Sequence, residues 1–107
     1  MEVYIIERRY ELNEAFKKVL GSNNVYFQPP ENIKLNYDCI IYKKGKAKKF
    51  RANNDVYINK DFYELLVISK KPDNHIVDEL EKSFKYCEHQ TSYTTNGLYH
   101  SVVNLFY

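Results

Sequence analysis

Residues able to perform catalysis or to bind a metal are few in this chain and widely spaced. Cys87, His89 and His100 come nearest to a zinc site, but a structural zinc ion needs four ligands at close spacing and the fourth is missing. Glu79 and Glu81 would point apart on a helix, so they make a poor acid–base pair. We therefore predict no catalytic residue, no cofactor and no metal, and expect that the protein is not an enzyme.

Other catalytic signatures are absent as well. The chain has only 3 glycines, all isolated, which excludes a glycine-rich phosphate loop, and neither G-x-S-x-G nor H-E-x-x-H occurs. We expect His75 to be a solvated residue at a helix start. Cys39 and Cys87 could form one long-range disulfide, but with no secretory leader visible at the N-terminus we favour reduced thiols in a cytosolic environment.

The strongest electrostatic feature is the basic segment 43–51, here called the basic arm. Its charged residues are Lys43, Lys44, Lys46, Lys48, Lys49 and Arg51. The formal net charge of the whole chain is only +2, so the rest of the chain is net acidic. The arm could be a solvated loop, could contact nucleic-acid phosphates through counterion release, or could dock on an acidic protein surface.

Two observations weigh against nucleic acid as the partner of the arm. Lysine dominates over arginine, although arginine makes the better bidentate phosphate contacts. The aromatic strand signature of an RNA-stacking sheet is also missing. We therefore favour contact with protein and retain a small nucleic-acid-binding module as the alternative from another functional class.

Length and composition indicate one soluble globular domain spanning residues 1–107. Apolar residues make up 44% of the chain, which is too many for a disordered protein, and no apolar run is long enough to cross a membrane. The 11 tyrosines and 6 phenylalanines, with no tryptophan, favour half-buried sheet faces and subunit interfaces.

The hydrophobic pattern predicts the order helix, strands, helix, strands. We expect helices over 7–20 and 75–85, strands over 25–27, 38–43, 56–58, 62–69, 86–93 and 98–107, and an exposed loop or hairpin for the basic arm. Asn96-Gly97 predicts a tight hairpin turn. The result is an α+β fold, with a mostly antiparallel sheet of about five strands and two helices packed on one face. Because segment 62–69 is apolar on both faces, its second face should meet a partner or a second layer.

Several segments, in order along nearly the whole chain, strongly resemble a small family of tailed-bacteriophage proteins from Gram-positive hosts. They are Leu20–Pro30, Leu35–Tyr42, Ala52–Tyr57, Ser69–Asn74, Tyr93–His100 and Leu105–Tyr107. The chain departs from the family pattern at Asp38, where proline is usual, in the turn Lys71–Asn74, and in a heavier basic arm. The family looks like the tail terminators, also called tail-completion or tail-to-head joining proteins.

This resemblance implies an α+β structural protein of the virion tail or neck, assembled in the host cytoplasm. Such a subunit would form a homo-oligomeric, hexameric ring that caps the head-proximal end of the tail tube and stops tube polymerisation. Its expected partners are the tail tube protein, the head–tail connector or neck proteins, and the sheath if the tail is contractile. No membrane is expected, and nucleic acid only through proximity to the DNA channel. A head-completion or connector-adaptor protein is the alternative within the same biology.

We predict that subunit or partner contacts involve the charged residues of the basic arm and four residues of the last strand. The full set is Lys43, Lys44, Lys46, Lys48, Lys49, Arg51, Tyr99, His100, Phe106 and Tyr107.

Overall fold

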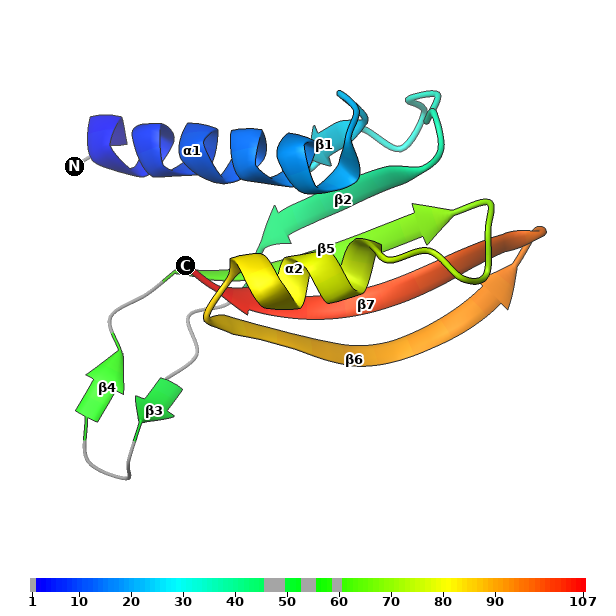
Figure 1. Cartoon of the computed structure of the whole chain (residues 1–107). Coiled ribbons are helices and arrows are strands. Elements are labelled where there is room, and N and C mark those ends of the chain that lie inside the picture. Colours follow the sequence, from blue (N-terminus) through cyan, green and yellow to red (C-terminus); the bar gives the residue numbers. More distant parts are fainter. Residues whose placement is uncertain (1, 46–49, 53–55, 59–60) are drawn as a thin grey trace.

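The computed structural model describes residues 2–45, 50–52, 56–58 and 61–107 (Figure 1). The elements, in chain order, are α1 (Glu2–Leu20), β1 (Val25–Phe27), β2 (Cys39–Lys44), β3 (Phe50–Ala52), β4 (Val56–Ile58), β5 (Phe62–Ser69), α2 (Ile76–Ser83), β6 (Tyr86–Thr95) and β7 (Leu98–Phe106). The α+β class is therefore confirmed.

Five of the strands form one sheet in the order β1-β2-β5-β7-β6. The strands β2, β5, β7 and β6 pair antiparallel, whereas β1 pairs parallel to β2 with Val25 opposite Ile40. The sheet is thus mixed, and this is the one detail of the predicted sheet that needs correction. A three-residue strand has too little pattern to reveal the direction of its pairing.

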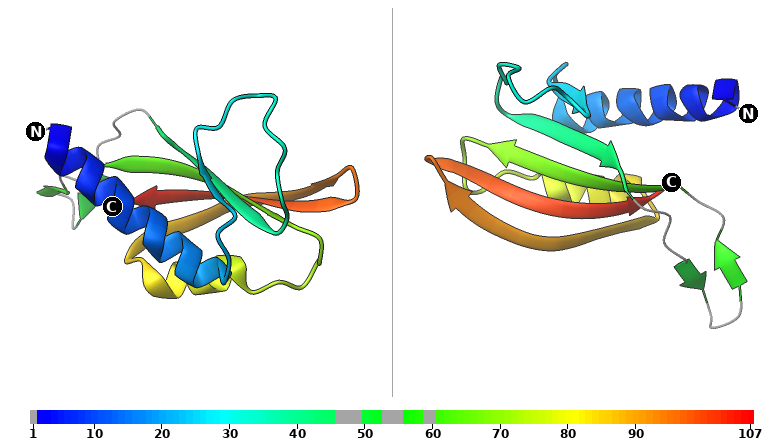
Figure 2. Two further views of the ribbon diagram at one scale, coloured as in Figure 1. Left: turned by 90° about the horizontal axis from the view of Figure 1, so that it is seen from above. Right: turned by 180° about the vertical axis from the view of Figure 1, so that it is seen from behind.

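The strands β3 and β4 form a separate two-stranded hairpin, with Arg51 opposite Tyr57. Both Figure 1 and Figure 2 show this hairpin standing apart from the five-stranded sheet. The basic arm therefore leaves the sheet at the end of β2 and continues into β3. Its residues 46–49 lie outside the described part of the chain.

Helix α1 packs on the sheet through one stripe of apolar residues. Leu12 and Phe16, one turn apart, have no exposed surface, and Val19 and Leu20 continue the stripe. Gly21 ends the helix with a φ of 78°, and its N–H donates to the Lys17 carbonyl at 2.8 Å. This left-handed cap requires glycine's freedom from a Cβ clash.

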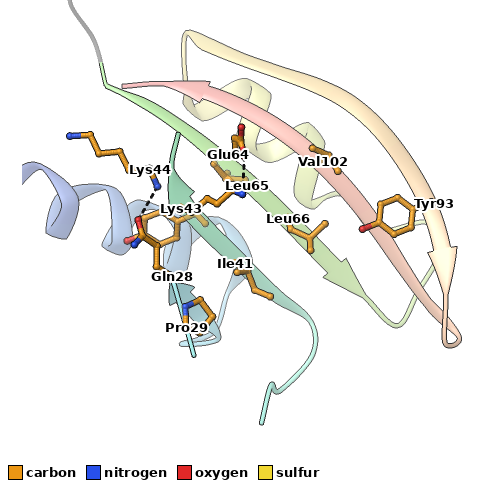
Figure 3. A pocket seen from close by; sticks show the side chains of 11 residues that line it. Gln28, Pro29, Ile41, Lys43, Lys44, Glu64, Leu65, Leu66, Tyr93 and Val102 are labelled. Carbon is orange, nitrogen blue, oxygen red and sulfur yellow. Dashed lines mark hydrogen bonds and ion pairs between the residues drawn. The ribbon is translucent and has the colours of Figure 1, made fainter. Parts of the chain in front are cut away.

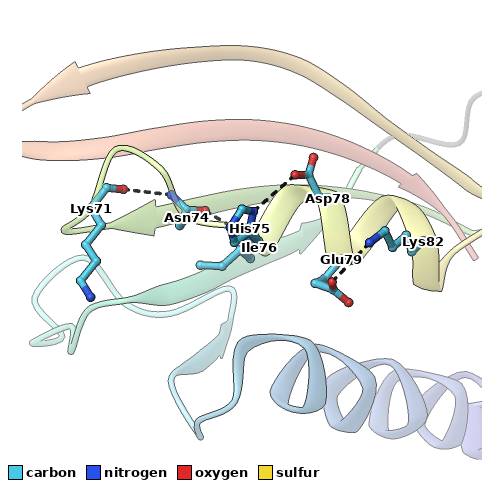
Figure 4. Close-up of polar contacts among 7 residues, drawn as sticks. All are labelled: Lys71, Asn74, His75, Ile76, Asp78, Glu79 and Lys82. Carbon is cyan, nitrogen blue, oxygen red and sulfur yellow. Dashed lines mark hydrogen bonds and ion pairs between the residues drawn. The ribbon is translucent and has the colours of Figure 1, made fainter.

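Helix α2 begins after a turn whose polar contacts are drawn in Figure 4. The side-chain oxygen of Asn74 accepts a hydrogen bond from the Ile76 N–H, and its amide donates to the Lys71 carbonyl. Asn74 therefore supplies the capping interaction, although the N-cap position itself is His75. The helix is shorter than predicted because Phe84 is already extended, and its ring packs 5.6 Å from that of Phe16.

Both helices cover the same face of the sheet, and the core lies between the two layers. Buried side chains from the helices (Leu12, Phe16, Ile76, Leu80) meet buried side chains from the strands (Ile40, Tyr42, Tyr63, Leu65, Val67, Val103, Leu105). The Tyr42 ring meets Phe16 edge-on at 5.0 Å, and its hydroxyl donates to the Asn13 side-chain oxygen at 2.8 Å. A buried tyrosine thus keeps its polar end satisfied inside an aromatic core.

Candidate functional site

The face of the five-stranded sheet opposite the helices is here called the open face. Because side chains alternate along a strand, residues that neighbour core positions point to this face. The register places Ile41, Leu66 and Val102 side by side on β2, β5 and β7. All three are aliphatic and only half-buried. They form an apolar row across the middle of the open face.

The next row along the strands is charged. Lys43 lies opposite Glu64, and their side chains form an ion pair at 3.3 Å. Asn104 and Glu88 continue this row on β7 and β6. Since the Lys43 and Glu64 side chains are 64% and 39% exposed, this pair contributes little to stability. Their charges cancel, so the net negative charge of the row comes from Glu88.

Aromatic pairs bound the open face at both ends. The ring of Tyr93 stacks on that of His100, with centroids 4.8 Å apart and planes 10° from parallel. At the other end Phe62 and Phe106 pack at 4.9 Å. Tyr93 remains 47% exposed, so its outer ring face is available to a partner.

These rows enclose a groove of about 670 Å³, drawn in Figure 3. Ile41, Leu66 and Val102 supply its apolar floor, Tyr93 closes one end, and Gln28 and Pro29 close the side next to β1. The volume lies within the range of sites that hold small ligands or several side chains of a partner. Its lining is mainly apolar, which suits recognition by shape and burial more than catalysis.

The root of the β3–β4 hairpin is fixed to the sheet on both sides. Gly45 donates its N–H to the Phe62 carbonyl at 2.9 Å, and a Cβ at this position would collide with the Phe62 ring. Asp61 and Tyr107 exchange two backbone hydrogen bonds, at 3.0 and 2.9 Å. Lys44 adds an ion pair to Asp61 at 3.7 Å. The hairpin therefore starts from a defined position at this end of the sheet.

The basic-arm residues predicted as contacts fall into three groups. Lys43 and Lys44 are exposed at the end of β2 and border the groove. Arg51 lies in β3, and nothing is described of its side chain. Lys46, Lys48 and Lys49 lie outside the described residues. The structure thus brings two of the six positive charges to one described surface.

The predicted contact residues of the last strand are divided between the two faces. His100 and Phe106 belong to the open face, where His100 is only 9% exposed. Tyr99, paired with Thr94, points to the helix side. Tyr107 follows β7, and its hydroxyl donates to the Glu11 carboxylate at 3.2 Å. All contacts described here are internal, so a role in subunit contact stays a prediction for these four residues.

Sequence reasoning missed the apolar row as a site. The signal was present as strands that are apolar on both faces, but only the register shows that Ile41, Leu66 and Val102 are neighbours. Tyr93 lies in the predicted strand 86–93 and in the segment Tyr93–His100 of the family resemblance, but neither observation predicts that it borders a groove. Its partner His100 lies beyond the Asn96-Gly97 turn, where both residues adopt positive φ.

Residues with catalytic potential do not converge on a site in the described chain. The Nε2 atom of His89 lies 2.8 Å from Ser92 Oγ but also 3.1 Å from the Thr91 carbonyl, which can only accept a hydrogen bond. The Thr91 carbonyl therefore favours the His89 tautomer that carries its hydrogen on Nε2. In that tautomer Nε2 has no free lone pair and could not accept a proton from Ser92. Among the described residues, no cluster of three or more His, Cys, Asp or Glu side chains is placed to hold a metal.

Neither cysteine forms a disulfide. Burial, and secondarily the Asp38 charge, raises the pKa of the Cys39 thiol to about 11. Burial, assisted by Glu81, raises the pKa of Cys87 to about 11 as well. Both thiols are therefore almost entirely protonated at neutral pH and poorly nucleophilic.

Within the part of the chain that the structure describes, no helix has the length and apolar character needed to cross a membrane. Comparisons with protein-family models, curated proteins and solved structures find no match to this chain.

Proposed function

We propose that this protein is a tail-terminator subunit of a tailed bacteriophage, which assembles as a homo-oligomeric ring on the head-proximal end of the tail tube. The observation that carries the proposal is the open face, where Ile41, Leu66 and Val102 form a half-buried apolar row across the middle of the sheet. A single chain leaves such a surface uncovered, whereas a subunit of an assembly covers it.

Two further features agree with an assembly subunit. The chain resembles the terminator family in segments distributed over its length. The β3–β4 hairpin stands apart from the sheet, where it could reach a neighbouring subunit (Figure 1). The expected chemistry is recognition of protein surfaces, with a ring that closes because successive copies are related by a fixed rotation.

In this proposal the ring stops tube growth by presenting two different surfaces. One surface would accept the last tube ring, while the other would refuse a further tube subunit and accept the head connector. The basic arm would bind an acidic surface of a neighbouring subunit or of the tube. Because such contacts are screened by salt, binding through the arm should weaken as ionic strength rises.

The direct test is negative-stain imaging of tail tubes incubated with the purified protein. Rings at one end of each tube, together with a native mass equal to a small multiple of the chain mass, are the expected result. The triple variant Lys46→Glu, Lys48→Glu, Lys49→Glu should reduce the fraction of capped tubes. A control variant with the same charge change on exposed lysines outside the arm (Lys34→Glu, Lys70→Glu, Lys71→Glu) should cap normally.

The outcomes separate the competing functions. A protein that stays monomeric and leaves the tubes uncapped is not a terminator. A protein that is absent from free tails but present on the connector of tailless heads is a connector adaptor. Steep loss of DNA binding by the isolated chain as salt concentration rises would instead indicate a nucleic-acid-binding module that uses the same arm.

A further inference from the structure

The border of the sheet along β6 is long and exposed. This strand comes last in the order of the sheet, and Figures 1 and 2 show it running along the sheet's border. All of its residues from Glu88 to Thr95 are exposed. Among the described strands β6 pairs only with β7, so its other side is an outer edge. The backbone N–H and C=O groups on such an edge are a template for pairing with another strand.

The opposite edge of the sheet carries features that block such pairing, whereas part of β6 does not. The strand β1 has only 3 residues, and the next residue, Gln28, has a φ of 43° and precedes two prolines. A short strand that ends at prolines offers few groups to a partner. In β6 a bulge between His89 and Thr91 interrupts the ladder. The segment after it, 91–95, contains no charged residue, proline or glycine, and is therefore unprotected.

The turn at 96–97 determines which backbone groups of this segment point outward. Both of its residues have positive φ, 53° and 73°, which is typical of the two-residue turn that closes with a backbone hydrogen bond between Thr95 and the residue after the turn. Because hydrogen-bonded and non-hydrogen-bonded pairs alternate along an antiparallel ladder, Thr95 and Tyr93 bond to β7. The N–H and C=O groups of Ser92 and Thr94 therefore point to the outer edge.

One antiparallel register between two copies of this segment avoids both the bulge and the turn. In this register Ser92 of each copy lies opposite Thr94 of the other, and the two residues exchange backbone hydrogen bonds. Tyr93 lies opposite Tyr93 of the second copy, on the two-fold axis. A register centred on Ser92 would place Thr94 opposite Gln90, in the bulge. A register centred on Thr94 would place Ser92 opposite Asn96, in the turn.

The side chains in this register are complementary as well. The facing pairs are all uncharged, namely Tyr93 with Tyr93, Ser92 with Thr94 and Thr91 with Thr95. Aromatic pairs and pairs of hydroxyl side chains stabilise neighbouring strands when they lie directly opposite each other. One face of the Tyr93 ring stacks on His100, and the side chain is still 47% exposed. Two copies of Tyr93 would therefore meet without displacing an internal contact.

We infer that β6 pairs antiparallel with β6 of a second copy about a two-fold axis through Tyr93, so that the sheets of the two copies join into one. Both copies use the same surface, so the contact is complete with two copies. A ring closes through two different surfaces instead. The inference therefore does not rest on the proposed function and adds a separate contact.

Disulfide trapping tests the register. Tyr93→Cys should give a covalent dimer on non-reducing denaturing gels after mild oxidation, because facing residues of a non-hydrogen-bonded pair have Cα atoms about 4.5 Å apart, within disulfide range. Thr91→Cys is the matched control, since Thr91 is exposed on the same face but its two copies would lie about 14 Å apart along the strands. This variant and the wild type should stay monomeric on the gel. Equal cross-linking of both variants, or none of Tyr93→Cys, would overturn the inference.

A pair of charge variants provides a second test, measured by sedimentation equilibrium. Tyr93→Lys and Tyr93→Glu should each weaken self-association by roughly ten-fold, because like charges would face each other on the axis. An equimolar mixture of the two variants should associate more tightly than either one alone, a rescue that requires the residue to face its own copy. Circular dichroism checks that each variant is folded.

Two results would contradict the inference in this second test. They are a mixture that associates no more tightly than its components, and a wild-type protein that shows no dimer at any concentration tested. Capping of tail tubes is measured separately by imaging. A failure of β6 pairing therefore leaves the ring proposal open to its own test, and a failure of capping leaves the disulfide result unchanged.

Discussion

The two faces of the five-stranded sheet are built from adjacent residues of the same strands. They differ in how far their side chains are buried by the rest of the chain. On the helix-covered face, the core side chains of β2, β5 and β7 are fully buried under α1 and α2, namely Ile40, Tyr42, Tyr63, Leu65, Val67, Val103 and Leu105. On the open face, Ile41, Leu66 and Val102 are equally apolar but only half-buried. The comparison indicates that the first face serves the stability of the single chain, and it is the second face that we propose for contact with another chain.

The largest effect is expected from emptying the centre of the helix-covered face. Phe16 has no exposed surface and contacts Tyr42 and Phe84. Phe16→Ala should lower the free energy of unfolding by about 3–5 kcal/mol through lost burial and a cavity. Urea denaturation followed by circular dichroism measures this change. A loss below about 1 kcal/mol would show that the α1–sheet layer is not a tightly packed core.

A matched pair of substitutions compares the two faces on one strand. Val102 and Val103 are consecutive in β7, but Val103 has no exposed surface whereas Val102 is half-buried on the open face. Val103→Ala should cost roughly 2 kcal/mol of unfolding free energy, and Val102→Ala less than about 1 kcal/mol. Assembly measured by sedimentation should show the opposite ranking. Equal stability losses would mean that the open face is already completed within the single chain.

A smaller effect is expected at the hydroxyl of Tyr42. Tyr42→Phe removes the hydrogen bond to Asn13 and should cost about 1 kcal/mol. Burial raises the pKa of Tyr42 from 10.0 to about 12, with the Arg9 charge opposing and Tyr63 adding to the shift. A raised pKa in the folded state means that the contribution of Tyr42 is fully present below pH 10 and decreases as the pH rises from about 10 to about 12.

Denaturation curves at several alkaline pH values test this pH dependence. Wild-type protein should lose stability over that window, and Tyr42→Phe should lose less. Because the thiols of Cys39 and Cys87 are also shifted upward, from 9.0 to about 11, some decline should persist in the variant. Identical pH profiles for the two proteins would contradict a buried, neutral Tyr42.

The smallest effect is expected at the charged row of the open face. Glu64→Gln removes the exposed ion pair with Lys43 and should change the unfolding free energy by less than about 0.5 kcal/mol. Thermal unfolding at low and at high salt is the measurement, and the difference should shrink at high salt. A larger, salt-independent loss would show that this row is structural, as the core is.

The sequence predicted the local elements well because their signals are local. Three of these elements depend only on residues close together in the sequence. They are the apolar stripe of Leu12 and Phe16, the glycine cap at Gly21 and the Asn96-Gly97 turn. The parallel pairing of β1 with β2 and the strand order depend on contacts between distant segments, which no short pattern contains. The contact residues proposed from the basic arm remain a prediction, since three of its lysines lie outside the described residues.

The open-face groove could not be predicted from the sequence, because it too depends on contacts between distant segments. Ile41, Leu66 and Val102 come from three strands, and each alone is an ordinary aliphatic strand residue. Their alignment follows from the register of β2, β5 and β7. A sequence can therefore indicate that a strand has two apolar faces, while the location of the resulting surface requires the three-dimensional pairing.

The root of the β3–β4 hairpin has a mechanical consequence. Tension applied to the hairpin by a partner enters the sheet at Gly45 and Asp61, the described residues next to its two connections. Gly45 is bonded to Phe62 in β5, and Asp61 is bonded twice to Tyr107, whose hydroxyl reaches Glu11 of α1. The first bonds to oppose such a pull would therefore be the backbone hydrogen bonds of Gly45 with Phe62 and of Asp61 with Tyr107.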